Sequence, residues 1–165
     1  MRDLSPGNDP TDIYMWRRID ERLTTSGQPS EEQLRAIREL GVSHVVNLGP
    51  HAHEKALPDE TGSVAALGMN YTYIPVDFDN PTEADFDSFC STMADLSGAT
   101  INIHCIANMR VSAFLYRYHR DHRWMPEPAA RELLEQLWRP GGVWATFIGD
   151  SGAQALDHRY PGRHY

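Results

Sequence analysis

The stretch at residues 100–112 reads TINIHCIANMRVS and decides the expected fold. Its first part, Thr100 to His104, is typical of a short buried strand because apolar and β-branched residues predominate. A helical stretch is expected from about Val111 to Arg123, which leaves a tight loop between strand and helix. In that layout, loop N–H groups and the positive end of a helix converge on one point. The stretch therefore predicts a phosphate cradle.

Helices alternate with strands on the amino-terminal side of this stretch. The elements expected from apolar periodicity and capping residues are one or two short strands in 13–23, turn residues at 24–28, a helix from Ser30 to Gly41, a strand at 42–48, a short helix at 60–68, a strand at 71–76 and a helix from Thr82 to Gly98. A final helix is expected at 127–139. This alternation predicts one α/β domain, with a central and mostly parallel sheet flanked by helices.

The chain has 165 residues, which is the usual size of a single domain. We expect a flexible N-terminal arm at 1–12, the α/β domain at 13–149 and a C-terminal tail at 150–165. No run of 18 apolar residues occurs, and the first residues lack the apolar stretch of a signal peptide. We therefore expect no membrane span and no secretion.

The charge balance also restricts the partners. Fifteen basic against 23 acidic residues give a net charge of −8, which offers no electrostatic support for nucleic acid or anionic lipid. The only two cysteines, Cys90 and Cys105, are too few for a disulfide framework and fit a reducing cytoplasm. Cys90 falls on the apolar side of its helix, and we expect it in the core.

Cys105 ends the central strand where backbone N–H groups and a helix N-terminus would lower the pKa of a thiol. A thiolate is a nucleophile, and an arginine such as Arg110 can bind an oxyanion with a fork of donors. Ser112 would stabilise the thiolate. The alternative for Cys105 is a small buried hydrophobic residue. On the first interpretation, we expect an exposed thiolate that is sensitive to peroxide.

These residues resemble the signature of the cysteine-dependent tyrosine and dual-specificity phosphatases, which is His-Cys, five residues, Arg, then Ser or Thr. The segment 26–30, the strand end at Asn47 and Leu48, and 74–76 are similar to a bacterial phosphatase-like group related to the beta-lactamase-hydrolase-like phosphatases. The resemblance implies a phosphatase-like fold and phosphorylated substrates. It implies a nucleophile at Cys105 and a phosphate site made by Ile106, Ala107, Asn108, Met109, Arg110 and Ser112.

The spacing departs from that signature, because only four residues separate Cys105 from Arg110. A truly shorter loop would have a smaller ring of N–H groups. If the loop instead keeps its length, Asn108 takes the place of the usual glycine, and Val111 that of the usual arginine. Arg110 would then begin the helix about 100° from the usual direction. The sequence leaves both geometries open.

The family also uses an aspartate on a loop before the nucleophile strand to protonate the leaving oxygen. Asp77 follows its strand directly and resembles the acid position, whereas Asp79 is the alternative. Either residue is otherwise a common loop acid that flanks a helix. We prefer Asp77, which would need surroundings that raise its pKa to act near neutral pH.

We expect no metal and no cofactor. His51, His53 and Glu54 form a small group of ligand types, but no matching cluster accompanies them, so we interpret them as solvated. His119 and His122 are expected on the surface, whereas Trp138 and Trp144 are expected in the core.

Three functions remain. The first is hydrolysis of phosphomonoesters through a cysteinyl phosphate, with Cys105, Arg110 and Asp77 as the catalytic residues. The second is rhodanese-like sulfur transfer, because rhodaneses resemble this chain in the four-residue gap between cysteine and arginine. The third is a module that binds phosphate without turnover.

Overall fold

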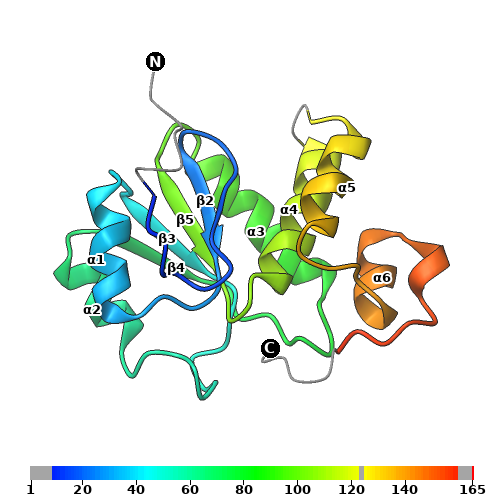
Figure 1. Ribbon diagram of the computed structural model, residues 1–165, viewed down its shortest axis with the longest axis horizontal. Helices are drawn as coiled ribbons and strands as arrows, with labels where there is room; N and C mark the ends of the chain where they lie inside the picture. Colours follow the sequence, from blue (N-terminus) through cyan, green and yellow to red (C-terminus); the bar gives the residue numbers. More distant parts are fainter. Residues whose placement is uncertain (1–8, 123–124, 160–164) are drawn as a thin grey trace.

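The computed structural model describes residues 9–122, 125–159 and 165, and within them one five-stranded sheet has the order β1-β2-β5-β3-β4 (Figure 1). Its strands are β1 (Arg17–Arg18), β2 (Leu23–Ser26), β3 (His44–Asn47), β4 (Asn70–Tyr73) and β5 (Ile101–His104). Strands β2, β5, β3 and β4 are mutually parallel, and β1 pairs with β2 antiparallel at one edge. The predicted α/β domain with a mostly parallel sheet is confirmed.

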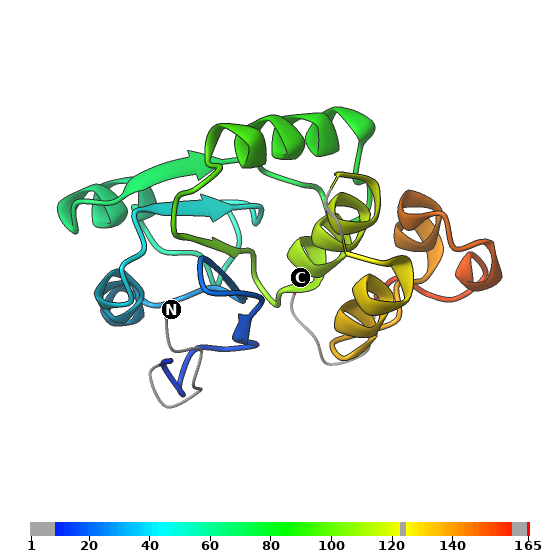
Figure 2. The ribbon, with the colours of Figure 1, turned by 90° about the horizontal axis from the view of Figure 1, so that it is seen from above.

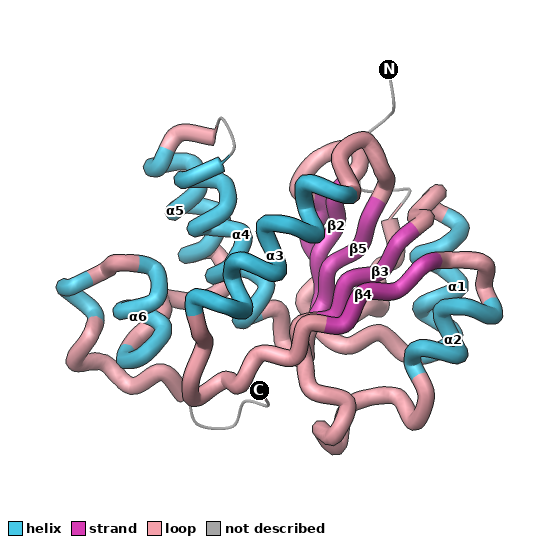
Figure 3. The backbone as a smooth tube through the Cα atoms, turned by 180° about the vertical axis from the view of Figure 1, so that it is seen from behind, coloured by secondary structure: helices cyan, strands magenta, loops and turns pink. Residues whose placement is uncertain are grey.

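Helices cover both faces of the sheet (Figures 1 and 2). One face carries α1 (Glu31–Glu39) and α2 (Glu60–Ala66). The other side carries α3 (Glu83–Asp95) and α4 (Met109–His122), with α5 (Glu127–Glu135) and α6 (Gly142–Ile148) packed against α4 (Figure 3). Neighbouring residues of a strand face opposite sides, so Val45 joins the core under α1 and α2 while Val46 joins the core on the other side.

Two helices begin where the capping residues predict. The Ser30 hydroxyl accepts a hydrogen bond from the Gln33 N–H, and the Gln33 side chain accepts one from the Ser30 N–H. Thr82 and Asp85 form the same reciprocal box at the start of α3. These boxes satisfy N–H groups that the first helical turn leaves without partners.

The turn predicted at 24–28 is wrong in its first part. Leu23–Ser26 is the inner strand β2, and all four of its residues are buried. Ser26 is in register with His104, so β2 lies directly beside β5, the strand that precedes Cys105. Pairing with strands on both sides outweighs the turn preference of Thr and Ser. The turn itself begins at Gly27.

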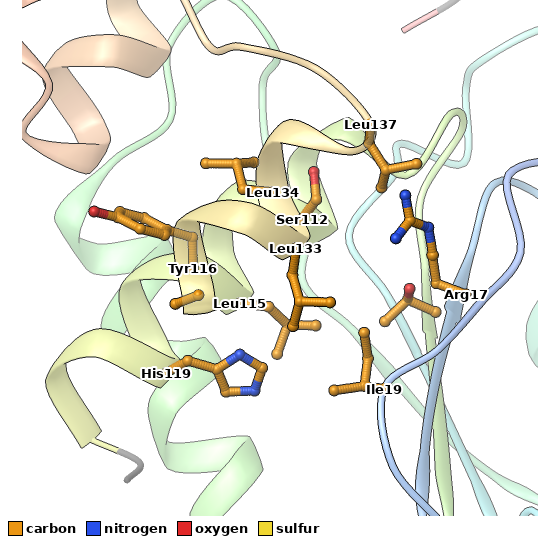
Figure 4. Close-up of a pocket in the computed structure, with 11 residues that line it drawn as sticks. Arg17, Ile19, Ser112, Leu115, Tyr116, His119, Leu133, Leu134 and Leu137 are labelled. Atoms are coloured by element: carbon orange, nitrogen blue, oxygen red, sulfur yellow. The ribbon is translucent and has the colours of Figure 1, made fainter. Parts of the chain in front are cut away.

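The surface position expected for His119 is also wrong, because α5 covers that side of α4. His119 is 2% exposed and lines a small pocket of about 20 Å³ between α4, α5 and β1 (Figure 4). That volume is close to the room one water molecule needs, so the cavity is not a ligand site. Trp138 and Trp144 are buried as predicted, whereas Cys90 is only half-buried at the edge of the core.

The two ends of the chain fall partly outside the described residues, namely 1–8 of the predicted arm and 160–164 of the predicted tail. Asp9 is held by Trp16 and Arg18. The tail contains a 3₁₀ helix, η2 (Ser151–Ala153). No helix of the described ranges is long and apolar enough to span a membrane.

Candidate active site

The loop from Cys105 to Asn108 joins β5 to α4 at the carboxyl edge of the parallel strands, where α/β folds place their sites. Two glycines, one after β2 and one after β3, leave room for this loop because they have no side chain. A Cβ atom on Gly27 would lie 2.5 Å from the Ile106 carbonyl oxygen, and one on Gly49 would lie 3.3 Å from the Cys105 carbonyl carbon. The loop backbone therefore packs directly on the backbone that follows β2 and β3.

Asn108 has a positive φ of 62° at the point where the loop enters α4. Its side-chain amide donates to the Met15 carbonyl at 2.9 Å and to the Thr25 hydroxyl at 3.0 Å. Asparagine tolerates this conformation better than most residues. Its two hydrogen bonds tie the loop to the segment before β1 and to β2.

Six consecutive backbone N–H groups of the loop and first helical turn donate to no acceptor among the described residues. They belong to Ile106, Ala107, Asn108, Met109, Arg110 and Val111. The first α-helical bond of this segment runs from the Ser112 N–H to the Asn108 carbonyl. The adjoining carbonyl of Ile106 accepts from the Gln28 N–H at 3.0 Å, which fixes the peptide plane between Ile106 and Ala107. These N–H groups are available to an anion.

The Arg110 side chain turns toward Cys105, although Arg110 stands one position earlier in the chain than the arginine of the phosphatase signature. It is buried, its Nε donates to the Val76 carbonyl at 2.7 Å, and its guanidinium lies 5.1 Å from the centre of the Phe78 ring. Burial lowers the pKa of Arg110, while the charge of Cys105 and a hydrogen bond with it raise that pKa. An arginine stays protonated despite such a shift. A permanent cation therefore lies beside the thiol.

Arg110 and Asp77 line the same surface pocket of about 430 Å³. The full lining is Pro50, Pro75, Val76, Asp77, Phe78, Arg110, Arg159 and Tyr165. Cys105 itself is 0% exposed, so the expectation of an exposed thiol is wrong. Close packing on Gly27 and Gly49 and the adjacent Arg110 side chain account for its burial.

Asp79 is engaged by the C-terminal segment. Its carboxylate accepts from His158 Nε2 at 2.8 Å and from Arg159 at 2.7 and 2.9 Å. The hydrogen bonds from Arg159 and His158 hold the pKa of Asp79 far below its usual range. Asp77 is exposed and accepts one hydrogen bond, from the Asp79 N–H at 2.9 Å. The two aspartates thus differ sharply in their surroundings.

The structure does not bring Ser112 to the pocket. Its hydroxyl donates to the Met109 carbonyl at 3.1 Å and accepts from Trp138 Nε1 at 2.9 Å, beside the small pocket of Figure 4. The hydroxyl therefore donates its single proton to the backbone of its own helix, α4. The hydroxyl cannot donate to the Cys105 sulfur in this arrangement.

Sequence reasoning missed Glu60, which is 2% exposed at the start of α2. One of its oxygens lies 2.5 Å from His104 Nε2, and the other accepts from the Gln28 side chain at 2.8 Å. Burial alone would raise the pKa of Glu60. The charge of His104, the hydrogen bond with His104 and the hydrogen bond from Gln28 lower this pKa by more, so the net shift is downward. A buried histidine needs hydrogen-bond partners, so the histidine at the end of the buried strand 100–104 was the one sequence signal that a partner such as Glu60 exists.

The histidines at 51 and 53 do not form a metal cluster, and no such group of three or more ligand types occurs in the part of the chain that the structure describes. His51 instead stacks on Tyr73, with ring centres 3.6 Å apart, and its Nε2 lies 2.8 Å from the Tyr71 hydroxyl. The Tyr73 hydroxyl accepts from the His51 N–H.

No family model matches the chain. A structure from Shewanella putrefaciens CN-32, described as DUF442 and named for a proposed phosphatase activity, is 31% identical in sequence with a TM-score of 0.76. The match covers 91% of this chain and 98% of that one. The chain belongs to the DUF442 family.

This DUF442 protein is also similar to other proteins over a smaller share or at lower identity. It is 34% identical over 96 residues to a beta-lactamase hydrolase-like protein of Agrobacterium fabrum. That match covers 56% of this chain but only 22% of the relative, so the chain aligns with about a fifth of the curated relative's length. P. aeruginosa TpbA in complex with pTyr has a TM-score of 0.62 at 17% identity, which shows the phosphatase-like fold alone.

Proposed function

We propose that this DUF442 protein is a cysteine-dependent phosphatase that hydrolyses phosphomonoesters through a cysteinyl-phosphate intermediate. One observation carries the proposal, namely that the six N–H groups after Cys105, which have no acceptor among the described residues, lie together with the buried Arg110 cation. A phosphate dianion needs both many donors and positive charge in a site shielded from water. The DUF442 relative named for phosphatase activity supports the same reading.

In the first chemical step, the Cys105 thiolate attacks phosphorus as the bond from phosphorus to the leaving oxygen breaks. The carboxylic acid of Asp77 gives its proton to that oxygen, and the alcohol leaves. Loop N–H groups and the terminal nitrogens of Arg110 hold the equatorial oxygens, because Arg110 Nε is already used by the Val76 carbonyl. The product of this step is a phosphorylated cysteine and an ionised Asp77.

In the second step, water attacks the phosphorylated cysteine. Asp77, now a carboxylate, accepts a proton from the water as the bond between sulfur and phosphorus breaks. Inorganic phosphate leaves, and the thiolate and the acid are restored. We assign this role to Asp77 because it lines the pocket with Arg110, whereas Asp79 is held ionised by Arg159 and His158.

The proposed substrates are phosphorylated proteins or small molecules. TpbA, which shares the fold, was solved with pTyr, and the pocket of this chain contains two aromatic rings, Phe78 and Tyr165, stacked 4.2 Å apart. Cys105 has no exposed surface, so the phosphate can reach the sulfur only when side chains at the base of the pocket move. An aryl phosphate is therefore a suitable first substrate.

The deciding experiment compares initial rates of aryl-phosphate hydrolysis from pH 5 to 8 for the wild type, Cys105→Ser and Cys90→Ser. We expect Cys105→Ser to lose activity by at least about a thousandfold, because the nucleophile is gone. Cys90→Ser is the matched control and keeps its rate, since Cys90 is half-buried at the far edge of the core. Equal rates for wild type and Cys105→Ser would refute the proposal.

Sulfur transfer is the second candidate, and the four-residue gap between Cys105 and Arg110 favours it. In that reaction the Cys105 thiolate takes a sulfur atom from a donor such as thiosulfate, sulfite leaves, and the persulfide passes the sulfur to cyanide. This chemistry does not need Asp77. Thiosulfate-to-cyanide transfer that depends on Cys105, without aryl-phosphate hydrolysis, would replace the first candidate by the second.

A further inference from the structure

We propose that Arg159 forms a second oxyanion site at the rim of the pocket, so that the protein prefers substrates whose leaving group carries a carboxylate or a phosphate. This site deepens the proposed function and rests on it, because the first phosphate is taken to bind at the loop after Cys105. Arg159 lines the pocket together with Arg110 and Asp77. Hydrolysis itself, as proposed, does not require Arg159.

Arg110 and Arg159 contact the same aromatic ring from different parts of the chain. The guanidinium carbon of Arg110 lies 5.1 Å from the centre of the Phe78 ring, and that of Arg159 lies 5.4 Å from it. The two carbons are therefore no farther apart than the sum of these distances. Burial lowers the pKa of Arg110, and the charge of Arg159 acts in the same direction, so each cation acts on the other. Two cations on one pocket suit a ligand with two anionic groups.

The two arginines differ in exposure, which places them at different depths. Arg110 is buried, whereas half of the Arg159 side chain is exposed. The phosphate therefore binds at the base of the pocket, and Arg159 faces the part of the substrate nearer to solvent. Hydrogen bonds with Asp79 raise the pKa of Arg159, and the charge of Asp77 also raises it. Since Asp77 is the proposed acid for the leaving oxygen, Arg159 lies on the side of the leaving group.

The contacts of Arg159 leave one edge of its guanidinium group open. Nε and Nη2 donate to the two carboxylate oxygens of Asp79 at 2.7 and 2.9 Å. These bonds use two of the five N–H donors of an arginine, and the others have no acceptor among the residues that the structure describes. The rings of Phe78 and Tyr165, each 5.4 Å from the guanidinium carbon, restrict its position. The open edge can bind an oxyanion by two parallel bonds while Asp79 stays in place.

Asp79 also limits the strength of this second site. Its carboxylate offsets the charge of Arg159, and the two side chains are 55% and 51% exposed, so water screens both groups. We therefore expect a second anionic group to improve binding by about fivefold, the upper end for a pair of exposed charges. An effect of this size makes Arg159 a residue that determines specificity.

The test uses two phosphonates, which have no ester bond to hydrolyse. They are para-phosphonobenzoate and para-phosphonobenzamide, which have nearly the same shape and differ in the charge of the second group. Calorimetric titrations at pH 8 and one ionic strength give the ratio of their dissociation constants. We expect the benzoate to bind the wild type about fivefold more tightly than the benzamide. Arg159→Gln should bind both equally.

Arg139→Gln is the matched control, because the Arg139 side chain is also 51% exposed and is also paired with an aspartate, Asp150, but lies outside the pocket lining. It should keep the fivefold ratio. A ratio near one in the wild type would overturn the inference without any variant. A ratio retained in Arg159→Gln would overturn it too, and so would an equal loss in both variants, because the effect would then be one of overall charge.

The results also separate this second site from the proposed phosphatase function. Aryl-phosphate hydrolysis that depends on Cys105, without a preference for the benzoate, would keep the function and overturn the second site. A preference that depends on Arg159, without hydrolysis, would keep the second site and overturn the function. If neither phosphonate binds to the wild type, the second site is overturned, because it requires the first anion at the loop.

Discussion

Arg110 donates its Nε hydrogen to the backbone carbonyl of Val76, 2.7 Å away. Val76 directly precedes Asp77, so a single hydrogen bond joins the proposed anion-binding loop to the loop with the proposed acid. The bond also orients the guanidinium, whose terminal nitrogens remain free of this contact. Arg110, although one residue early relative to the signature, could thus still face the phosphate in the proposed mechanism.

Arg110→Lys should therefore damage catalysis although it keeps the charge. Lysine lacks the planar fork and cannot hold the Val76 carbonyl and two phosphate oxygens together. We expect kcat/KM for an aryl phosphate to fall by about 10²- to 10³-fold, as for loss of an oxyanion donor. Arg117→Lys, on the same helix but paired with exposed Glu83, is the control in steady-state assays. Wild-type kcat/KM in Arg110→Lys would contradict the assigned role.

The choice between the two aspartates can be tested by the dependence of the rate on the leaving group. Asp77→Asn should slow hydrolysis by about 10²-fold or more for poor leaving groups and less for good ones, because a general acid matters most when the leaving oxygen is basic. Asp79→Asn should show no such dependence. Rates for a series of substituted aryl phosphates provide the measurement, and a steeper dependence in Asp79→Asn would reverse the assignment. Thiosulfate-to-cyanide transfer, if present, should be insensitive to Asp77→Asn.

Substitutions at Asn108 should separate backbone strain from lost hydrogen bonds. Asn108→Gly removes the bonds to Met15 and Thr25 but suits the positive φ, so we expect a loss of about 1 to 2 kcal/mol of unfolding free energy. Asn108→Ala adds the strain of a left-handed conformation and should cost about 2 to 4 kcal/mol. Urea unfolding of both variants gives the comparison. Equal stabilities would mean that φ contributes nothing at this position.

The contact between Asp79 and the C-terminal segment should be lost in acid. Its pKa is lowered in the folded protein, so the contact stabilises the fold fully above the usual aspartate pKa, near 4, and this stabilisation declines as the pH falls from there through the lowered pKa. Half of the Asp79 side chain is exposed, so salt should weaken the contact too. The NMR signal of Arg159 Nε–H should be protected at pH 6, stay protected well below pH 4 because the pKa of Asp79 is lowered, and be unprotected in Asp79→Asn. An identical signal in both proteins would contradict the contact.

The sequence predicts most of the sheet and the place of Cys105 between a central strand and a helix, because these depend on local patterns. Capping boxes mark the starts of α1 and α3, and Cys105 follows a short apolar strand. The inner strand β2 was not predicted, since its threonines and serine have no strand pattern of their own and depend on pairing with β5. His119 was misplaced for a similar reason, because its burial comes from α5.

The finer features of the site depend on contacts between distant segments. Glu60 looks like an ordinary acidic residue at a helix start, and only the fold brings it to His104, 44 positions later in the chain. The direction of Arg110 depends on the carbonyl of Val76, 34 positions earlier. A backbone carbonyl carries no sequence signal at all. The motif alone therefore left two loop geometries open.

The anchor of Asn108 on Met15 has a consequence for the timing of folding. The two residues are 93 positions apart, so this hydrogen bond forms only after a long chain segment has closed on itself. Until then, the Asn108 side chain lacks one of the two hydrogen bonds that tie the loop to distant segments. A chain still emerging from the ribosome, or one that has partly unfolded, carries an ordinary cysteine. Because Cys105 has no exposed surface in the folded protein, loss of its reactivity toward a thiol probe would report completed folding.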